Sequence, residues 1–219
     1  RMVADAEVGF EKMKQSFIEE LFSSQEIDVW DPHEHKFFGP STRSLAFYGD
    51  VNEDRARLLV SQILHLESLS DEEQITIYLN TPGGSLTDGL AIHDVIKEVS
   101  CPVVVIAQGL CASAGLLIMA AADYKAASKN TTFFYHQPVV RDNSINSMND
   151  MLSFSNHYEY CRDISDSLIL KSSKMRKNLW NKFFAGQTSF YFNTDKALQF
   201  KIIDEVVSSR KLNFKITKD

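Results

Sequence analysis

Hydrophobic and polar positions alternate along this chain in two ways, and each pattern predicts a different kind of element. Short apolar runs bounded by glycine, proline or asparagine are typical of strands, whereas apolar residues that recur every three or four positions indicate helices. From Ser44 onward the two patterns follow one another repeatedly. The predicted strands cover residues 44–49, 74–80, 102–109 and 131–138, and the predicted helices cover residues 53–68, 86–99 and 113–122.

Strands and helices that alternate in this way predict an α/β fold, with repeated β-α-β units around a mostly parallel sheet. The apolar run Val103–Ile106 is unbroken, which is typical of a strand covered on both faces. One face of the first predicted helix carries four apolar residues: Ala56, Leu59, Ile63 and Leu66. We therefore expect these four side chains to lie in the core.

The last third of the chain predicts one long helix at about residues 144–171. Its apolar positions are spaced by three and four and comprise Met148, Met151, Phe154, Tyr158 and Cys161. Its length and loose polar face suggest an arm that protrudes from the core toward a partner subunit, for oligomer contacts. The elements expected after it are a helix near 174–184, a strand at 189–193, a helix at 194–200 with Thr194 as N-cap, and a strand at 202–207.

Residues 1–43 differ in character from the rest of the chain. The spacing of apolar residues predicts an amphipathic helix at 7–22, and the following segment to residue 42 contains prolines and a glycine and is expected to be irregular. We therefore divide the chain into a divergent N-terminal segment, residues 1–43, and a main domain, residues 44–219.

The composition excludes several classes of function. The 219 residues are 44% hydrophobic and 24% charged, which is typical of a globular protein. The net charge of −6 argues against nucleic acid as a main partner, because phosphate binding needs a basic surface. No apolar run reaches the roughly 18–20 residues of a membrane span. Charged residues interrupt the N-terminal region where a secretory signal needs an apolar stretch, so we expect a cytoplasmic protein without a membrane partner.

Neither a metal nor a cofactor is expected from the residues that usually bind one. The three cysteines are an odd number and show no C-x-x-C spacing, so they suggest neither a disulfide framework nor a zinc site. His33 and His35 have an H-x-H spacing, but no third ligand accompanies them. We interpret this pair as part of a solvated loop.

One hydroxyl, that of Ser113 in the stretch GLCASAG, lies where a strand is predicted to end and a helix to begin. The first N–H groups of a helix have no intrahelical partners and the helix dipole is positive there, so the position favours negative charge. Ser113 is therefore either a nucleophile for acyl transfer or a small residue that permits close packing. The motif resembles the G-x-S-x-G nucleophile elbow, with Cys111 in place of the first glycine. Cys111 is a weaker candidate nucleophile, because nothing nearby would activate a thiolate.

Two other strand ends carry residues that could take part in catalysis, in the stretches NTPGG and FFYHQP. An N–H group of the glycine pair, together with that of Ala114, would form an oxyanion hole with two donors. His136 ends a strand just before a proline stop, and it is either a structural histidine or a general base. Because reacting groups in a parallel α/β sheet gather at the carboxyl ends of the strands, these stretches are expected to lie near one another.

These motifs occur in an order that is similar to that of the Clp protease proteolytic subunits, the ClpP family. The resemblance covers about residues 44–207 and rests on FYGDVNEDRARLLVSQILHLE, ITIYLNTPGGSLTDGLAIHDVI, VVVIAQGLCASAGLLIMAAA, FFYHQPVV and ALQFKIIDEVV. It implies a ClpP/crotonase-type fold and a serine endopeptidase that cleaves unfolded polypeptide, without a cofactor and without using ATP itself. It also implies Ser113 as nucleophile and His136 as general base. The oxyanion hole would be formed by Gly84 and Ala114, with Gly83 as the alternative.

The same resemblance shows a departure at the third catalytic position. Counting back from Asp204, the position of the family's aspartate falls on Ser189. A serine is a weak hydrogen-bond acceptor and supplies no negative charge to an imidazolium. Asn193 and Asp195 are alternative residues for orienting His136, and the sequence does not decide among the three.

The resemblance also implies partners. Family members form homo-oligomers of two stacked heptameric rings, with the long helix interleaved between the rings, and an AAA+ unfoldase feeds the chamber. Residues 1–43 do not resemble the short axial segment that docks an unfoldase, which argues against the usual mode of docking. The expected location is the cytoplasm, or the plastid stroma if the chain is of plastid origin.

Two other functions are compatible with the sequence. The first is a non-catalytic ClpP-like structural subunit or scaffold, which the missing aspartate suggests. The second is a crotonase-type hydratase or isomerase acting on acyl-CoA thioesters. That function would need an acidic catalytic residue near the glycine turn rather than a serine and a histidine, so it is the weaker alternative.

Overall fold

The computed structural model describes residues 29–31, 36–38, 43–137, 147–173, 175–184 and 189–207. The chain divides into two compact units, Arg1–Ser44 and Leu45–Asp219. In the first unit, strand β1 (Val29–Asp31) pairs antiparallel with strand β2 (Lys36–Phe38). The helix predicted at 7–22 and the H-x-H pair lie outside the described residues.

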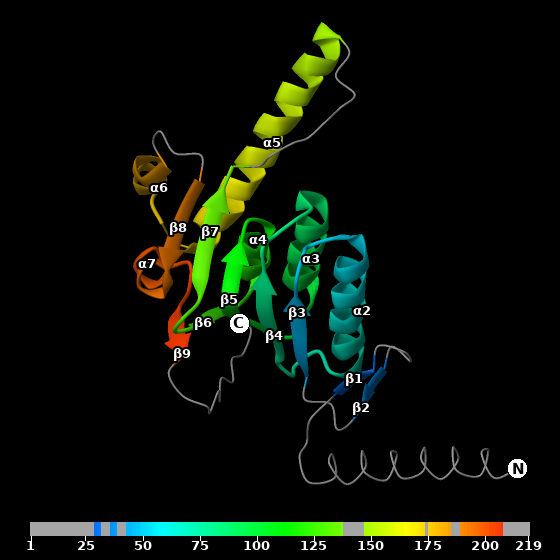
Figure 1. Ribbon diagram of the computed structural model, residues 1–219. Coiled ribbons are helices and arrows are strands. Elements are labelled where there is room, and N and C mark those ends of the chain that lie inside the picture. Colours follow the sequence, from blue (N-terminus) through cyan, green and yellow to red (C-terminus); the bar gives the residue numbers. More distant parts are fainter. Residues whose placement is uncertain are drawn as a thin grey trace, which may run out of the picture. The chain divides into compact units, whose positions relative to one another are not determined.

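A seven-stranded sheet forms the centre of the second unit (Figure 1). Its main path runs in the order β3 (Ser44–Tyr48), β4 (Ile75–Thr81), β5 (Val103–Ala112), β6 (Tyr124–Ser128) and β9 (Glu205–Val207). Strand β7 (Thr132–His136) pairs with β5 and with β8 (Ser189–Asn193). The pairs β4–β5, β5–β6, β5–β7 and β6–β9 are parallel, and β7–β8 is antiparallel. The predicted α/β fold with a mostly parallel sheet is confirmed.

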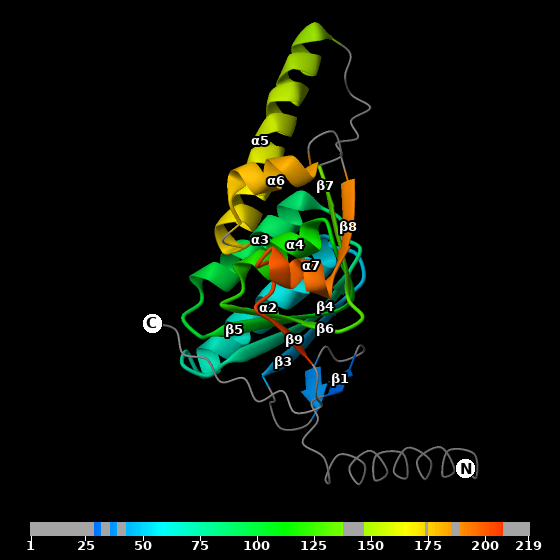
Figure 2. The same ribbon diagram turned by 90° about the vertical axis from the view of Figure 1, so that its left-hand side faces the viewer.

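Three helices follow strands β3, β4 and β5 and bury their apolar faces: α2 (Glu53–Leu69), α3 (Leu86–Glu98) and α4 (Ala114–Ala121). They lie side by side, α2 against α3 and α3 against α4 (Figures 1 and 2). The four apolar residues predicted for the core face of α2 are all buried. The run Val103–Ile106 is buried on both faces of the sheet, because its alternate residues belong to two separate apolar clusters. Burial of this apolar surface is the main force that holds helices and sheet together.

The pattern did not predict strand β6, whose sequence YKAAS lacks the usual apolar run. Its second residue, Lys125, is buried, and the ammonium group donates a hydrogen bond to the carbonyl of Ser172 at 2.5 Å. A buried ammonium needs such a partner, and the partner comes from a distant helix. The strand pairs with β5 and β9 and carries a buried lysine bonded to a residue far away in the sequence, which no local pattern reveals. His93 on α3 is also buried, and its Nδ1 lies 2.9 Å from Oδ1 of Asp94.

The sheet divides along strand β5. Residues 104–107 pair with β6, whereas residues 110–112 pair with β7. Gly109 lies between the two stretches with a φ of 65°, and the N–H of the next residue, Leu110, donates to the side-chain oxygen of Asn80 at 3.1 Å. This irregularity brings the β7–β8 pair next to the end of β5 (Figure 1). The end of β7 thereby comes close to the start of α4.

The long helix expected at 144–171 is α5 (Met148–Ser173). Its buried residues are spaced by four and lie in its second half: Cys161, Ser165, Ile169 and Ser173. Its first half extends beyond the sheet (Figure 1) and exposes large apolar side chains, among them Met148 and Leu152. None of the helices in the described ranges is long and apolar enough to cross a lipid bilayer.

The C-terminal elements follow the predicted order, with one correction. Helix α6 (Lys177–Phe184) is followed by β8 and by α7 (Thr194–Gln199). The N-cap of α7 is Asn193, not Thr194, because the Asn193 side chain accepts the Lys196 N–H at 3.1 Å. The Thr194 hydroxyl instead donates to the carbonyl of Lys129 at 3.2 Å.

Candidate active site

Ser113 forms the sharp turn between β5 and α4. Its φ of 54° and ψ of −120° are unusual for a residue with a side chain, and such strain persists only where the surrounding structure holds it. Its N–H donates to the carbonyl of Phe134 on β7 at 2.8 Å. The side chain makes no capping bond to α4, so the hydroxyl is not used to begin the helix. The turn has the strained strand-to-helix character of a nucleophile elbow.

Glycines allow the backbone to approach this turn closely. A Cβ atom on Gly83, whose φ is 90°, would lie 2.5 Å from the Cβ of Ser113. A Cβ atom on Gly115 would lie 2.5 Å from Cγ2 of Thr81. The small residues therefore do serve close packing, as one interpretation of the motif predicted. They pack around the Ser113 hydroxyl, which makes no capping hydrogen bond to α4.

Hydrogen bonding distinguishes the two glycines of the NTPGG turn. The Gly83 N–H donates to Oγ1 of Thr81 at 3.0 Å, so this donor is already engaged. Val51 bonds to the residues on either side of Gly84, donating to the Gly83 carbonyl and accepting the Ser85 N–H. Within the described residues, no hydrogen bond occupies the N–H of Gly84 or that of Ala114, the first residue of α4. Gly84 and Ala114 are thus the available pair of donors.

His136 ends strand β7, and its ring has a defined partner. The ring atom Nδ1 lies 2.6 Å from the main-chain oxygen of Gln137. A carbonyl oxygen only accepts hydrogen bonds, so Nδ1 carries the proton in the neutral ring and Nε2 keeps a free lone pair. This is the tautomer that a histidine needs to act as a base through Nε2. The Phe134 ring, on the same face of β7, lies 5.4 Å from the His136 ring between centroids.

Ser113 and His136 line one cavity of about 460 Å³, together with Gly84 and Ala114. We call it the serine cavity. Its wall on the α5 side consists of residues spaced by four: His157, Cys161, Ser165 and Ile169. No motif in the sequence pointed to these residues as part of a site. Their spacing was the available signal, because it places them on one face of a helix.

The register of β7 and β8 locates the three candidates for the third position. Ser189 lies directly opposite His136, and Asn193 lies opposite Thr132 at the other end of the pair. Directly opposed residues have Cβ atoms about 5 Å apart, whereas four residues along a strand span about 13 Å. The Asn193 side chain also caps α7, and Asp195 lies beyond it in the first turn of that helix. Ser189 is therefore the candidate next to the ring.

Cys111 is not a competing nucleophile. Its side chain is fully buried, and burial raises the pKa of the thiol far above its ordinary value. The group is therefore protonated at neutral pH, and only the thiolate is nucleophilic. Among the described residues, no group of three histidine, cysteine or carboxylate side chains is placed to hold a metal ion.

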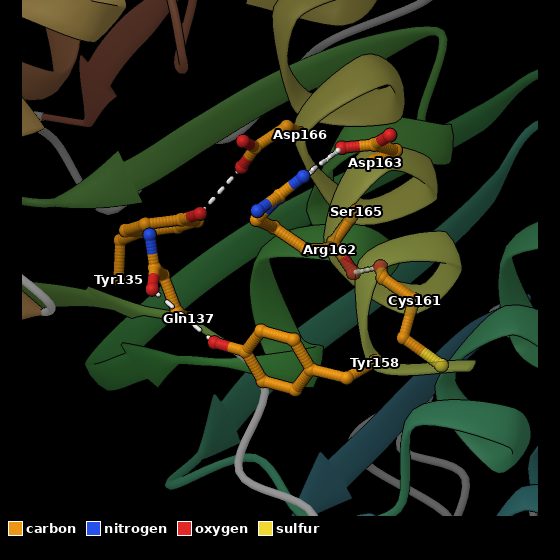
Figure 3. A network of polar contacts seen from close by, with 8 residues as sticks. All are labelled: Tyr135, Gln137, Tyr158, Cys161, Arg162, Asp163, Ser165 and Asp166. Carbon is orange, nitrogen blue, oxygen red and sulfur yellow. Dashed lines mark hydrogen bonds and ion pairs between the residues drawn. The ribbon is translucent and has the colours of Figure 1, made fainter. Parts of the chain in front are cut away.

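A polar network attaches α5 to the end of β7 (Figure 3). The hydroxyl of Tyr135 donates to the Asp166 carboxylate, and the hydroxyl of Tyr158 donates to Oε1 of Gln137 at 3.2 Å. Burial raises the pKa of Asp166, and hydrogen bonds from Tyr135 and Trp180 oppose this effect. Burial and then the bond to Asp166 raise the pKa of Tyr135. The residues on both sides of His136 are thus tied to the same helix.

Comparison with known proteins identifies the family. The family model of the Clp protease matches residues 40–210. The chain belongs to the Clp protease family. It is 30% identical over 171 residues to the ATP-dependent Clp protease proteolytic subunit 2 of Treponema pallidum. The aligned region covers 77% of this chain and 84% of that protein. The solved structure of an asparagine-to-aspartate mutant of ClpP1 from Listeria monocytogenes matches with a TM-score of 0.67 and 28% identity. That match covers 77% of this chain and 93% of the ClpP1 chain.

Proposed function

We propose that this Clp protease family member is a serine endopeptidase subunit that cleaves unfolded polypeptide, with Ser113 as nucleophile and His136 as general base. One observation carries the proposal. Among the described residues, a serine on a strained turn and a histidine whose Nε2 has no hydrogen-bond partner line the same cavity as two N–H groups without partners. A nucleophile, a base and an oxyanion hole are the parts that acyl transfer requires.

The reaction follows from these parts. Oγ of Ser113 attacks the scissile carbonyl carbon while Nε2 of His136 takes the hydroxyl proton, and the Gly84 and Ala114 N–H groups stabilise the oxyanion. The C–N bond then breaks, and the imidazolium gives its proton to the leaving amine. Water, deprotonated by His136, attacks the acyl-enzyme and releases the carboxylate product and the serine hydroxyl.

Ser189 sets the expected rate of this peptidase. It lies opposite His136. By the resemblance it occupies the position of the family's aspartate, but it has no charge to stabilise the imidazolium that forms. Loss of a triad aspartate with retained geometry can lower turnover by about 10⁴ in a serine protease, an effect that includes selection of the wrong histidine tautomer. We therefore expect this peptidase to be slow. The same observation favours the second candidate, a non-catalytic subunit that contributes structure to an oligomer.

Assembly and partners are part of the proposal. The exposed apolar residues on the first half of α5 include Met148, Met151, Leu152 and Tyr160. Burial of such residues between copies of the chain would stabilise an oligomer. On the basis of the resemblance to the family, we propose that the chain assembles into stacked heptameric rings and that an AAA+ unfoldase is its partner. Cytoplasmic location likewise stays a prediction.

A fluorophosphonate probe tests the proposal, because it reacts covalently with an activated serine. We expect slow labelling of the purified protein between about pH 6 and pH 9, as befits catalysis by an imidazole base. Labelling should be absent in Ser113→Ala and strongly reduced in His136→Ala, and turnover of an unstructured fluorescent peptide should follow the same order. An intact oligomer without labelling at any pH in this range would favour the structural subunit.

A further inference from the structure

We infer that the main-chain carbonyl of Gln137 positions the His136 ring in place of the missing aspartate, and that Tyr158 keeps Gln137 in place through its side chain. This inference rests on the proposed function and identifies what orients the base. Its starting point is the 2.6 Å contact between Nδ1 of His136 and the oxygen of Gln137. Gln137 is here a positioning residue, because it acts through the ring and not on the substrate.

A carbonyl acceptor performs half of the task of an aspartate. It accepts the Nδ1 proton, which selects the neutral tautomer with a free Nε2 and fixes the ring plane. It carries no full negative charge, so it stabilises the imidazolium less than a carboxylate does. An enzyme built in this way would keep a correctly oriented base and lose rate mainly through weaker charge stabilisation.

The β7–β8 ladder does not hold Gln137. The last paired residue of β7 is His136, opposite Ser189, so Gln137 is the first residue beyond the ladder. Its carbonyl direction therefore needs another constraint. The side chain supplies one, since its Oε1 accepts the hydroxyl proton of Tyr158 on α5 at 3.2 Å (Figure 3).

The surroundings of Tyr158 support this role. Its side chain is half-buried, and the neighbouring bond from Tyr135 to Asp166 attaches the same part of α5 to β7. The Ser189 side chain is exposed, and the structure shows no hydrogen bond between it and the His136 ring. Of the two nearby oxygens, the Gln137 carbonyl is the one that contacts Nδ1.

Removal of the Tyr158 hydroxyl tests the inference with little change in volume. Tyr158→Phe should lower the rate of fluorophosphonate labelling about threefold to tenfold, the factor expected for one hydrogen bond. Gln137→Leu should cause a similar fall. The double variant should fall no further than the larger single effect, because both residues act in one chain of contacts. The matched control is Tyr48→Phe on β3, which removes a tyrosine hydroxyl that donates to Oε1 of Gln108 at 2.6 Å outside this network and should leave the rate unchanged.

Two readouts separate positioning from a general loss of structure. In the Ser189→Asp background, Tyr158→Phe should change the labelling rate less than about twofold, because a carboxylate opposite the ring provides a stronger acceptor for Nδ1. The ¹⁵N spectrum of histidine-labelled protein should show the Nδ1–H tautomer for His136, with a larger Nε2–H share in Tyr158→Phe. A wild-type ring in the Nε2–H tautomer, or a Tyr158→Phe variant that is labelled at the wild-type rate, would overturn the inference. If wild-type protein is not labelled at all, the proposed function fails, and the ring spectrum still decides whether Nδ1 carries the proton.

Discussion

His136 and Ser189 lie directly opposite each other in the antiparallel pair of β7 and β8. Side chains opposed in this way share one face of the pair and are close enough to interact. The Phe134 and Tyr191 rings, the next opposed pair on this face, stack with centroids 4.0 Å apart, which shows how closely the two strands pack here. A longer or charged residue at position 189 would therefore reach the imidazole.

The first prediction concerns a carboxylate at this position. Ser189→Asp should raise the rate of fluorophosphonate labelling at least about tenfold, out of the roughly 10⁴ that a triad aspartate contributes through charge and tautomer selection together. The labelling rate measured at a series of reaction times gives this effect.

Asn193→Asp is the matched control for this change. It introduces the same charge on the same strand, but at the end opposite Thr132, and aspartate caps a helix about as well as asparagine does. Its labelling rate should stay within about twofold of wild type, since the carboxylate would lie about 13 Å along the strand from position 189. A rate increase in Asn193→Asp and none in Ser189→Asp would place the third group elsewhere.

The second prediction concerns the thiol that replaces a glycine of the nucleophile motif. Because burial keeps the Cys111 thiol protonated, iodoacetamide should modify it in denatured protein and leave it intact in folded protein. Cys111→Ala should retain fluorophosphonate labelling within about twofold, because the thiol takes no part in the proposed chemistry. Peptide mapping by mass spectrometry gives both results, and loss of labelling in a folded Cys111→Ala variant would argue for a chemical role of the thiol.

The third prediction concerns the packing beneath Ser113. Gly115→Ala places a methyl group 2.5 Å from Cγ2 of Thr81, so it should lower the free energy of unfolding by about 1–3 kcal/mol. Thr81→Ser removes that methyl group but keeps the Oγ1 atom that accepts the Gly83 N–H. The double variant should recover at least half of the loss, which thermal or urea unfolding will measure. Equal loss in the single and the double variant would show that contact with the Thr81 methyl group does not cause the loss.

The fourth prediction uses the raised pKa of Asp166, for which burial is the main cause. A carboxyl that binds its proton more tightly in the folded state stabilises the fold fully below its ordinary pKa of 3.8 and loses this contribution as pH rises through the folded-state value. Asp166→Asn keeps an acceptor for the Tyr135 hydroxyl and removes the charge. The stability of wild type relative to Asp166→Asn should therefore fall as pH rises above about 3.8.

Urea unfolding of both proteins from about pH 4 to about pH 8 checks the fourth prediction. The matched control is Asp163→Asn on the same helix, where the carboxylate is exposed and bonded only to the neighbouring Arg162 among the contacts that the structure gives. The difference between wild type and Asp163→Asn should not show this fall with rising pH. Parallel stability curves for wild type and Asp166→Asn would contradict the prediction.

The sequence by itself determined the strand and helix order of the main domain and the positions of Ser113 and His136 at strand ends. It could do so because apolar periodicity and turn residues are local signals, and because strand ends in a parallel sheet share one edge. It also predicted the long helix and the four buried residues of α2. The family followed from the order of these local motifs.

Only the tertiary structure decided which atoms meet. The engaged N–H of Gly83, the capping role of Asn193 and the contact between His136 and the Gln137 carbonyl depend on main-chain directions that no residue type encodes. Strand β6 escaped prediction for the same reason, because the partner of its buried lysine comes from the far end of α5. A hydrogen bond needs two groups within about 3 Å and a suitable angle, and only the folded chain brings distant segments to that distance.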